Sequence, residues 1–182
     1  MRVALIGGSF NPPHIGHLLA AHYVRAARRP DQVWWVPAYR HPFGKGLAPF
    51  EHRVEMCRRL CEDASGWLRV DPIEQELPGE GRTVDLLEAL TARHPETRFS
   101  WVMGSDILKE LPQWKQFDRV RVLADVWVLH RAGHPSPEAF GPPLAEVSST
   151  AVRDALATGR EVEDLVPQRV LEYLREHRLY LP

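Results

Sequence analysis

Short apolar runs alternate along the chain with longer segments in which apolar residues recur every three or four positions. The short runs are rich in β-branched and aromatic residues, and they predict β-strands at 2–6, 32–36, 67–70, 98–103 and 124–129. The longer segments have the period of an amphipathic helix, and they predict helices over 14–29, 49–61, 83–90, 148–156 and 168–177. Strands and helices therefore alternate through most of the chain.

This alternation favours an α/β fold, because parallel strands joined by helical crossovers bury both faces of one sheet. We expect a Rossmann-like, doubly wound parallel sheet in three layers, followed by the C-terminal helices. Residues 132–147 are rich in proline and glycine, and we expect them to form a loop after the last strand. The sequence contains no long linker, so residues 1–182 are expected to form a single domain.

Length, charge and cysteine content limit the classes of function. A chain of 182 residues can bury a sizeable core, and its formal net charge of −1 provides no global field to recruit nucleic acid. The apolar runs are too short for a signal peptide or a membrane span, so neither a membrane nor a nucleic acid is an expected partner. Cys57 and Cys61 lie one helical turn apart without further zinc ligands at suitable spacing, which indicates reduced thiols and a cytoplasmic location.

The first predicted strand leads into the stretch with the strongest chemical signal, GGSFNPPHIGHL at 7–18. Glycines at a strand end let a phosphate approach the backbone, and free N–H groups at the following helix start point at an anion. His14 and His17 are three residues apart at that helix start, so both can face one ligand. Either histidine alone could be a hydrogen-bonded bystander, but the pair after a Gly-Gly turn favours a binding role.

A second anion site is indicated at 148–153, SSTAVR, where a later helix begins. Hydroxyl groups at a helix start can simply cap it, yet together with free N–H groups and the helix dipole they also bind phosphate. Arg153 lies one turn further on, and its planar guanidinium suits phosphate oxygens. Arg40 and Lys45 follow the second strand, where ligands of open α/β sheets bind, so they are candidate phosphate partners as well.

The two segments resemble the HxGH and SSTxxR motifs of the nucleotidyltransferase superfamily, whose members transfer AMP or CMP to a phosphate or related acceptor. The resemblance implies that His14, His17 and Arg153 are catalytic. Asp106 follows the fourth predicted strand, where a carboxylate can accept hydrogen bonds from a ribose hydroxyl or cap the next helix. The ATP-binding residues that the resemblance implies are Gly8, Ser9, Phe10, His14, Gly16, His17, Lys45, Gly104, Asp106, Ser148, Ser149, Thr150 and Arg153.

Three more segments are similar to those of bacterial nicotinate-nucleotide adenylyltransferases: RTVDLL at 82–87, MGSD at 103–106 and LPQW at 111–114. In that family the threonine of the first segment helps to hold nicotinate, and the tryptophan of the last stacks on the pyridine ring. From the residues alone, the threonine can equally be a helix N-cap and the tryptophan a packing anchor. The substrate-binding residues that the resemblance implies are Arg40, Thr83, Trp114 and Arg131.

The chain departs from the family pattern at three places. Arg82 stands where a tyrosine is usual in the family, so we expect a wall of the nicotinate pocket to differ here. The lysine loop reads HPFGK rather than PPHK, which weakens the assignment of Lys45 as a phosphate ligand. The stretch between Arg131 and Ser148 is short for the family, so a contact or dimer surface there is not carried over.

The resemblance implies transfer of AMP from ATP to nicotinate mononucleotide, giving deamido-NAD and pyrophosphate. Mg²⁺ is the expected cofactor, held by ATP phosphates and water rather than by a metal site of the protein. The alternatives are a sister enzyme that uses nicotinamide mononucleotide or phosphopantetheine, and a non-catalytic nucleotide-binding module. The T-x-D and P-x-W matches disfavour phosphopantetheine, and the intact histidines and SSTxxR motif disfavour the module. The sequence leaves both a monomer and a homo-oligomer open.

Overall fold

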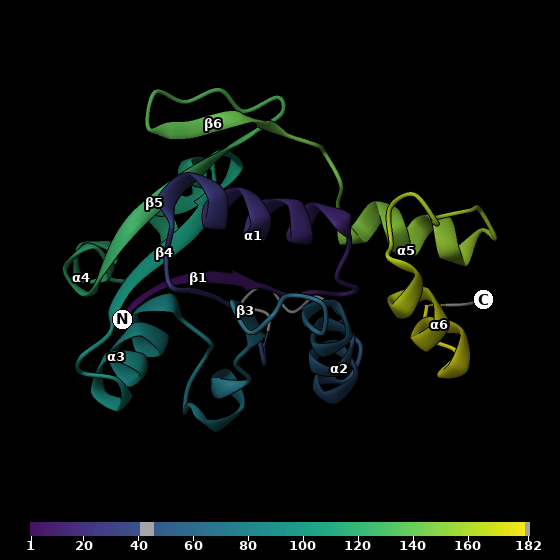
Figure 1. Ribbon diagram of the computed structural model, residues 1–182, viewed down its shortest axis with the longest axis horizontal. Helices are drawn as coiled ribbons and strands as arrows, with labels where there is room; N and C mark the ends of the chain where they lie inside the picture. The colour runs from purple at the N-terminus through teal and green to yellow at the C-terminus, as the bar shows by residue number, and fades with distance from the viewer. Residues whose placement is uncertain (41–45, 181–182) are drawn as a thin grey trace.

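A computed structural model describes residues 1–40 and 46–180, and its strands form one parallel sheet (Figure 1). Six strands are assigned within these residues, in the spatial order β3-β2-β1-β4-β5-β6. The strands are β1 (Arg2–Gly8), β2 (Gln32–Pro37), β3 (Leu68–Val70), β4 (Arg98–Gly104), β5 (Ala124–Arg131) and β6 (Ala139–Leu144). The order reverses between β1 and β4, which is the arrangement of a doubly wound sheet.

Helices cover both faces of the sheet. The helices are α1 (Ile15–Arg28), α2 (Phe50–Cys61), α3 (Thr83–Arg93), α4 (Phe117–Leu123), α5 (Ser149–Ala157) and α6 (Gln168–Glu176), with short 3₁₀ helices η1 (Ile73–Glu76) and η2 (Ser105–Gln113). Residues of α1, α2, α5 and α6 belong to one hydrophobic core, and residues of α3 and α4 belong to the other. The expected three-layer, doubly wound α/β fold is therefore confirmed. In the described part of the chain, no helix has the length and apolar character that crossing a membrane requires.

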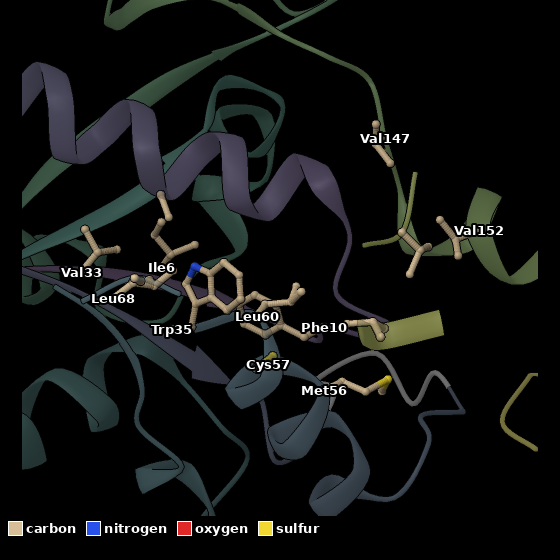
Figure 2. Packing of buried hydrophobic residues seen from close by; sticks show 14 of the residues in the cluster. Ile6, Phe10, Val33, Trp35, Met56, Cys57, Leu60, Leu68, Val147 and Val152 are labelled. Atoms are coloured by element: carbon tan, nitrogen blue, oxygen red, sulfur yellow. The ribbon is translucent and has the colours of Figure 1, made fainter. Parts of the chain in front are cut away.

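The central strands contribute to both cores because their side chains alternate between the two faces. Ala4 and Ile6 of β1 lie in the first core, while Val3 and Leu5 lie in the second. Strands buried on both faces are read in sequence as continuous apolar runs rather than as an apolar–polar alternation. Figure 2 shows Trp35 of β2 within the first core, together with Ile6 and other buried side chains.

The prediction of a loop over 132–147 is wrong, because β6 occupies Ala139–Leu144 beside β5. The strand contains Pro142 and Pro143, which have no backbone N–H to donate. Because prolines are rare within strands, the sequence pattern indicated a loop instead. The place of β6 at the rim of the described sheet tolerates those prolines. The ring of Phe140 stacks on Tyr23 at 5.9 Å, and the Arg28 guanidinium lies 4.1 Å from the Phe140 ring centroid. Packing against α1 therefore stabilises this strand.

Candidate functional site

A cleft of about 530 Å³ opens at the carboxyl ends of β1 and β4. Ligands of open α/β sheets bind at this place, where the strand order reverses. The cleft brings together the two segments predicted to bind anions and three of the four residues expected on the acceptor side, Thr83, Trp114 and Arg131. The sequence-predicted residues that line it are Gly8, Ser9, His14, Gly16, His17, Thr83, Gly104, Asp106, Trp114, Arg131, Ser148, Ser149, Thr150 and Arg153.

Two of the predicted residues that the structure describes, Phe10 and Arg40, do not line the cleft. Phe10 is fully buried, and its ring packs under His17 with the centroids 4.6 Å apart. Arg40 is exposed, and its guanidinium donates to the carbonyl oxygen of Gly79 at 3.1 Å. Lys45 lies outside the described residues. Phe10 thus supports the His17 ring, and the Arg40 side chain is bonded to Gly79 rather than lining the cleft.

The backbone at the start of α1 determines which nitrogen of His17 is free to donate a hydrogen bond. His14 is the N-cap residue, and its backbone N–H donates to Nδ1 of His17 at 3.1 Å. A neutral imidazole whose Nδ1 accepts a hydrogen bond carries its proton on Nε2. The two imidazole rings are 3.8 Å apart between centroids, so they are held as one unit. His17 therefore presents an N–H donor on the side of the ring away from the helix backbone.

Both histidines are neutral near pH 7. Burial, and secondly the positive charge of Arg131, lower the pKa of His14 from 6.5 to about 4. The pKa of His17 is also lowered well below 6.5, first by burial and then by His14 and Arg131, against the opposing effect of its backbone hydrogen bond. Among the described residues that line the cleft, the cationic charge therefore comes from Arg131 and Arg153.

The start of α5 is tied directly to the loop between β1 and α1. Ser148 caps the helix by accepting from the N–H of Ala151 at 3.2 Å. The Ser149 hydroxyl donates to the carbonyl oxygen of Pro12 at 2.8 Å. Arg153 donates to the carbonyl oxygen of Asn11 at 2.7 Å and to the Thr150 hydroxyl at 3.3 Å. These bonds fix the SSTxxR segment opposite the two histidines.

Asp106 and Arg131 form the part of the cleft at the end of β4. Nε of Arg131 lies 3.9 Å from Oδ1 of Asp106, so the two side chains form an ion pair. A Cβ on Gly104 would overlap the Asp106 carboxylate and crowd the Arg131 side chain, so a larger residue there would force these two side chains to move. The Ser105 hydroxyl accepts from the backbone N–H of Arg131 at 2.9 Å and donates to the carbonyl oxygen of His134 at 2.6 Å, which holds this corner together.

The interpretation of Thr83 as a helix N-cap is wrong by one position. Arg82 is the N-cap residue of α3, and Thr83 is the first helical residue and lines the cleft. The Arg82 guanidinium pairs with Glu80, and Arg82 is not among the residues that line the cleft in the described part of the chain. Trp114 also lines the cleft, and its indole meets the ring of Phe117 edge-on with centroids 5.9 Å apart.

Trp101 and Glu74 are among the cleft residues that sequence reasoning missed. The Trp101 indole lies across Gly7 so closely that a Cβ on Gly7 would overlap it. Glu74 of η1 is only 8% exposed, and its carboxylate accepts from the backbone N–H of Tyr39 at 3.0 Å. Burial raises the pKa of Glu74 to about 7, although the Tyr39 hydrogen bond and Arg53 oppose this. The paired glycines were a usable signal for Trp101, whereas nothing in the local sequence marks Glu74 as buried.

The described residues include no group of three or more His, Cys, Asp or Glu side chains that could hold a metal ion. Asp106, the acidic residue nearest to the cationic side chains of the cleft, is already paired with Arg131.

Comparisons with known proteins agree with this geometry. The family model described as cytidylyltransferase-like matches residues 5–155. A relative from Myxococcus xanthus, named probable nicotinate-nucleotide adenylyltransferase, is 58% identical over 99% of this chain and 95% of its own length. A relative of the same name from Anaeromyxobacter dehalogenans strain 2CP-C is 49% identical over 98% of this chain and 96% of its own length.

Solved structures share the fold at low sequence identity. Plasmodium falciparum nicotinic acid mononucleotide adenylyltransferase complexed with NaAD has a TM-score of 0.82 at 19% identity, and the match covers 98% of this chain and 97% of that chain. The same enzyme complexed with APC has a TM-score of 0.83 at 19% identity, with 98% and 96% covered. The chain belongs to the cytidylyltransferase-like family and, within it, to the nicotinate-nucleotide adenylyltransferases.

Proposed function

We propose that this protein transfers AMP from ATP to nicotinate mononucleotide, giving deamido-NAD and pyrophosphate. The observation that carries the proposal is one cleft that holds His14, His17 and Arg153 together with Thr83 and Trp114. The first three residues suit a nucleoside triphosphate, and the last two suit a flat pyridine ring with a polar substituent. The names of the full-length relatives support the same substrates.

The reaction needs positioning and charge stabilisation more than a base. The acceptor phosphate is already anionic at neutral pH, so it can attack the α-phosphate of ATP without losing a proton. A new P–O bond forms at the α-phosphate, and the bond to the β-phosphate breaks to release pyrophosphate. The barrier lies in bringing two anions together and in stabilising the charge that develops on the leaving group.

We assign the neutral histidines as hydrogen-bond donors to phosphate oxygens. Nε2–H of His17 is the donor that its backbone hydrogen bond leaves available. Arg153 and the hydroxyls and N–H groups at the start of α5 hold the β- and γ-phosphates, and Arg131 adds positive charge. When Mg²⁺ is bound with ATP, it neutralises part of the phosphate charge. Because neutral donors and fixed arginines surround the phosphates, the protein needs little reorganisation during the reaction.

The acceptor side of the cleft is assigned to Thr83 and Trp114. The Trp114 indole offers a flat surface on which a pyridine ring stacks, and the start of α3 at Thr83 offers backbone N–H groups to a carboxylate. We infer that residues 1–182 act as one nucleotidyltransferase domain, since α5 and α6 share a core with β1 and β2. Cys57 and Cys61 are free thiols, which supports a reducing, cytoplasmic location.

The proposal is tested by pyrophosphate release with ATP and Mg²⁺, offering nicotinate mononucleotide, nicotinamide mononucleotide and phosphopantetheine in parallel. We expect the highest kcat/KM with the acid mononucleotide. Preference for another acceptor would keep the phosphate chemistry but overturn the assignment of the acceptor pocket. ATP binding without pyrophosphate release from any acceptor would indicate a non-catalytic nucleotide-binding module.

A further inference from the structure

One buried residue in the cleft lining, Asn11, joins its own loop to residues 46–48, Arg153 and Tyr180 through its side chain and its backbone carbonyl. Asn11 is only 1% exposed, and its Oδ1 accepts from the backbone N–H of Ala48 at 3.0 Å and from the Tyr180 hydroxyl. Its Nδ2 donates to the carbonyl oxygen of Gly46 at 3.4 Å. Its backbone carbonyl accepts from Arg153 at 2.7 Å. The position of Asn11 therefore sets the position of Arg153.

The Tyr180 hydroxyl reaches Asn11 from the far end of the chain, 169 positions away in sequence. The backbone N–H of Leu179 donates to the carbonyl oxygen of Leu174 at 3.0 Å, which holds this end of the chain against α6. Burial raises the pKa of Tyr180 well above its usual value, and the charges of Arg53 and Arg153 only partly oppose this. Tyr180 is therefore a neutral hydrogen-bond donor near pH 7.

The carbonyl groups of the loop before α1 are held by two arginines from different elements. Arg53 of α2 is buried, and it donates to the carbonyl oxygen of Ser9 at 2.7 Å and to that of Ala48 at 3.0 Å. Arg153 of α5 holds the carbonyl oxygen of Asn11. Each arginine fixes the backbone, whereas the Asn11 side chain is fixed by the Ala48 N–H and the Tyr180 hydroxyl. Without Tyr180, Oδ1 of Asn11 keeps only one of its two described donors.

We propose that Tyr180 is a positioning residue for the ATP site, acting through Asn11 on the guanidinium of Arg153. The inference rests on the proposed function, in which Arg153 holds the phosphates of ATP. Arg153 uses one N–H on Asn11 and one on Thr150, so both contacts orient its remaining donors toward the cleft. A displaced Asn11 carbonyl would turn those donors away from the phosphates without removing any charge.

The test compares two tyrosine-to-phenylalanine variants. Tyr180→Phe removes the hydroxyl that contacts Asn11 and leaves the ring. Tyr173→Phe is the matched control, because its hydroxyl makes a 2.7 Å hydrogen bond to Nδ1 of His52, which is outside the cleft lining in the described part of the chain. We expect Tyr180→Phe to lower kcat/KM for ATP about five- to tenfold, as for one lost hydrogen bond. The KM for the mononucleotide should stay within about twofold, and Tyr173→Phe should leave both parameters within about twofold.

Equal losses of kcat/KM for ATP in Tyr180→Phe and Tyr173→Phe would overturn the proposal, because they would show a general weakening of the C-terminal segment. A second measurement is a double-mutant cycle with Arg153→Lys. If Tyr180 acts through Arg153, Tyr180→Phe should have less than a twofold effect on kcat/KM in the Arg153→Lys background. If Tyr180→Phe lowers kcat/KM as much in the Arg153→Lys background as in wild type, Tyr180 does not act through Arg153.

The binding of MgATP, measured by titration calorimetry, separates this proposal from the proposed function. If wild type releases no pyrophosphate with any acceptor, the proposed function fails, and the positioning role is still tested by the ratio of ATP dissociation constants. We expect Tyr180→Phe to weaken ATP binding severalfold and Tyr173→Phe to leave it unchanged. Identical dissociation constants for wild type and Tyr180→Phe, with unchanged kinetics, would refute the positioning role.

Discussion

The two nitrogens of His17 have different tasks in this structure, and substitutions can separate them. Nδ1 accepts the backbone N–H of His14 at 3.1 Å, and Nε2–H is assigned to phosphate. In His17→Asn, the amide oxygen can take the place of Nδ1, but no donor reaches the position of Nε2. In His17→Gln, the amide nitrogen can reach the position of Nε2, but the acceptor for His14 is lost.

The expected magnitudes follow from these two roles. Loss of one preorganised donor to developing phosphate charge costs about 10²–10³ in kcat, so His17→Asn should lose that much activity. Loss of a hydrogen bond at a helix start costs about 1 kcal/mol, which for a chain of this size lowers Tm by about 2–4 °C, and His17→Gln should show this loss. Both variants lose the contact of the imidazole with the Phe10 ring, so their difference isolates the two nitrogens.

The assay is steady-state pyrophosphate release at saturating ATP and acceptor, together with thermal unfolding of each variant. We expect His17→Asn to be the more stable variant and His17→Gln to be the more active one. Turnover of His17→Asn within about threefold of wild type would refute the assignment of Nε2–H as a donor to phosphate, because the loss of such a donor costs far more. The reverse order of the two unfolding temperatures would refute the role assigned to Nδ1.

Four further predictions concern other parts of the cleft. Trp114→Ala should raise KM for the mononucleotide much more than KM for ATP, and equal changes in steady-state kinetics would reject ring stacking. The pKa of His14 is about 4 in the folded protein and 6.5 in the unfolded chain, so the unfolded chain binds the proton first on acidification. The contribution of His14 to the free energy of unfolding should therefore fall by about 3 kcal/mol through that range. Glu74, with a pKa raised from 4.5 to about 7, gains stability on acidification between pH 7 and 4.5. On acidification from pH 7 to 5, the free energy of unfolding of Glu74→Gln, measured by urea titration, should therefore fall more steeply than that of wild type. The same dependence of this free energy on pH in both proteins would contradict the prediction. Gly7→Ala should cost about 1–3 kcal/mol, because its Cβ overlaps the indole beneath it. Gly46→Ala, whose Cβ meets no described atom within 4 Å, is the control, and equal unfolding temperatures for the two would show that the overlap is relieved without cost.

The strands and the two phosphate motifs could be predicted from the sequence because their signals are local. Central strands of a parallel sheet are continuous apolar runs, and β1, β2, β4 and β5 each appeared at nearly their observed bounds. The start of α5 was placed within one residue, since Ser148 is both a good N-cap and part of the SSTxxR segment. Local spacing also placed Ser149 and Arg153 on one side of that helix.

The missed features depend on contacts between distant segments. Glu74 lies in a polar stretch, and its burial follows from the backbone of Tyr39, 35 positions away. Arg53 stands in a helical segment among other charged residues, yet it is buried because it holds the carbonyls of the loop before α1. Arg40 was expected in the cleft because it follows β2, but a turn at Gly79 provides a nearer partner. None of these partners can be identified from the spacing of residues along the chain.

The proline pair of β6 has a consequence for how copies of this chain can associate. An outer strand with free N–H groups is a template on which a second molecule can add a strand, and proline has no N–H to offer. Pro142 and Pro143 are adjacent and exposed on that rim, and β3 at the opposite rim of the described sheet spans only three residues. Both rims therefore disfavour sheet extension between molecules, so a homo-oligomer of this protein would have to form through its helices and loops.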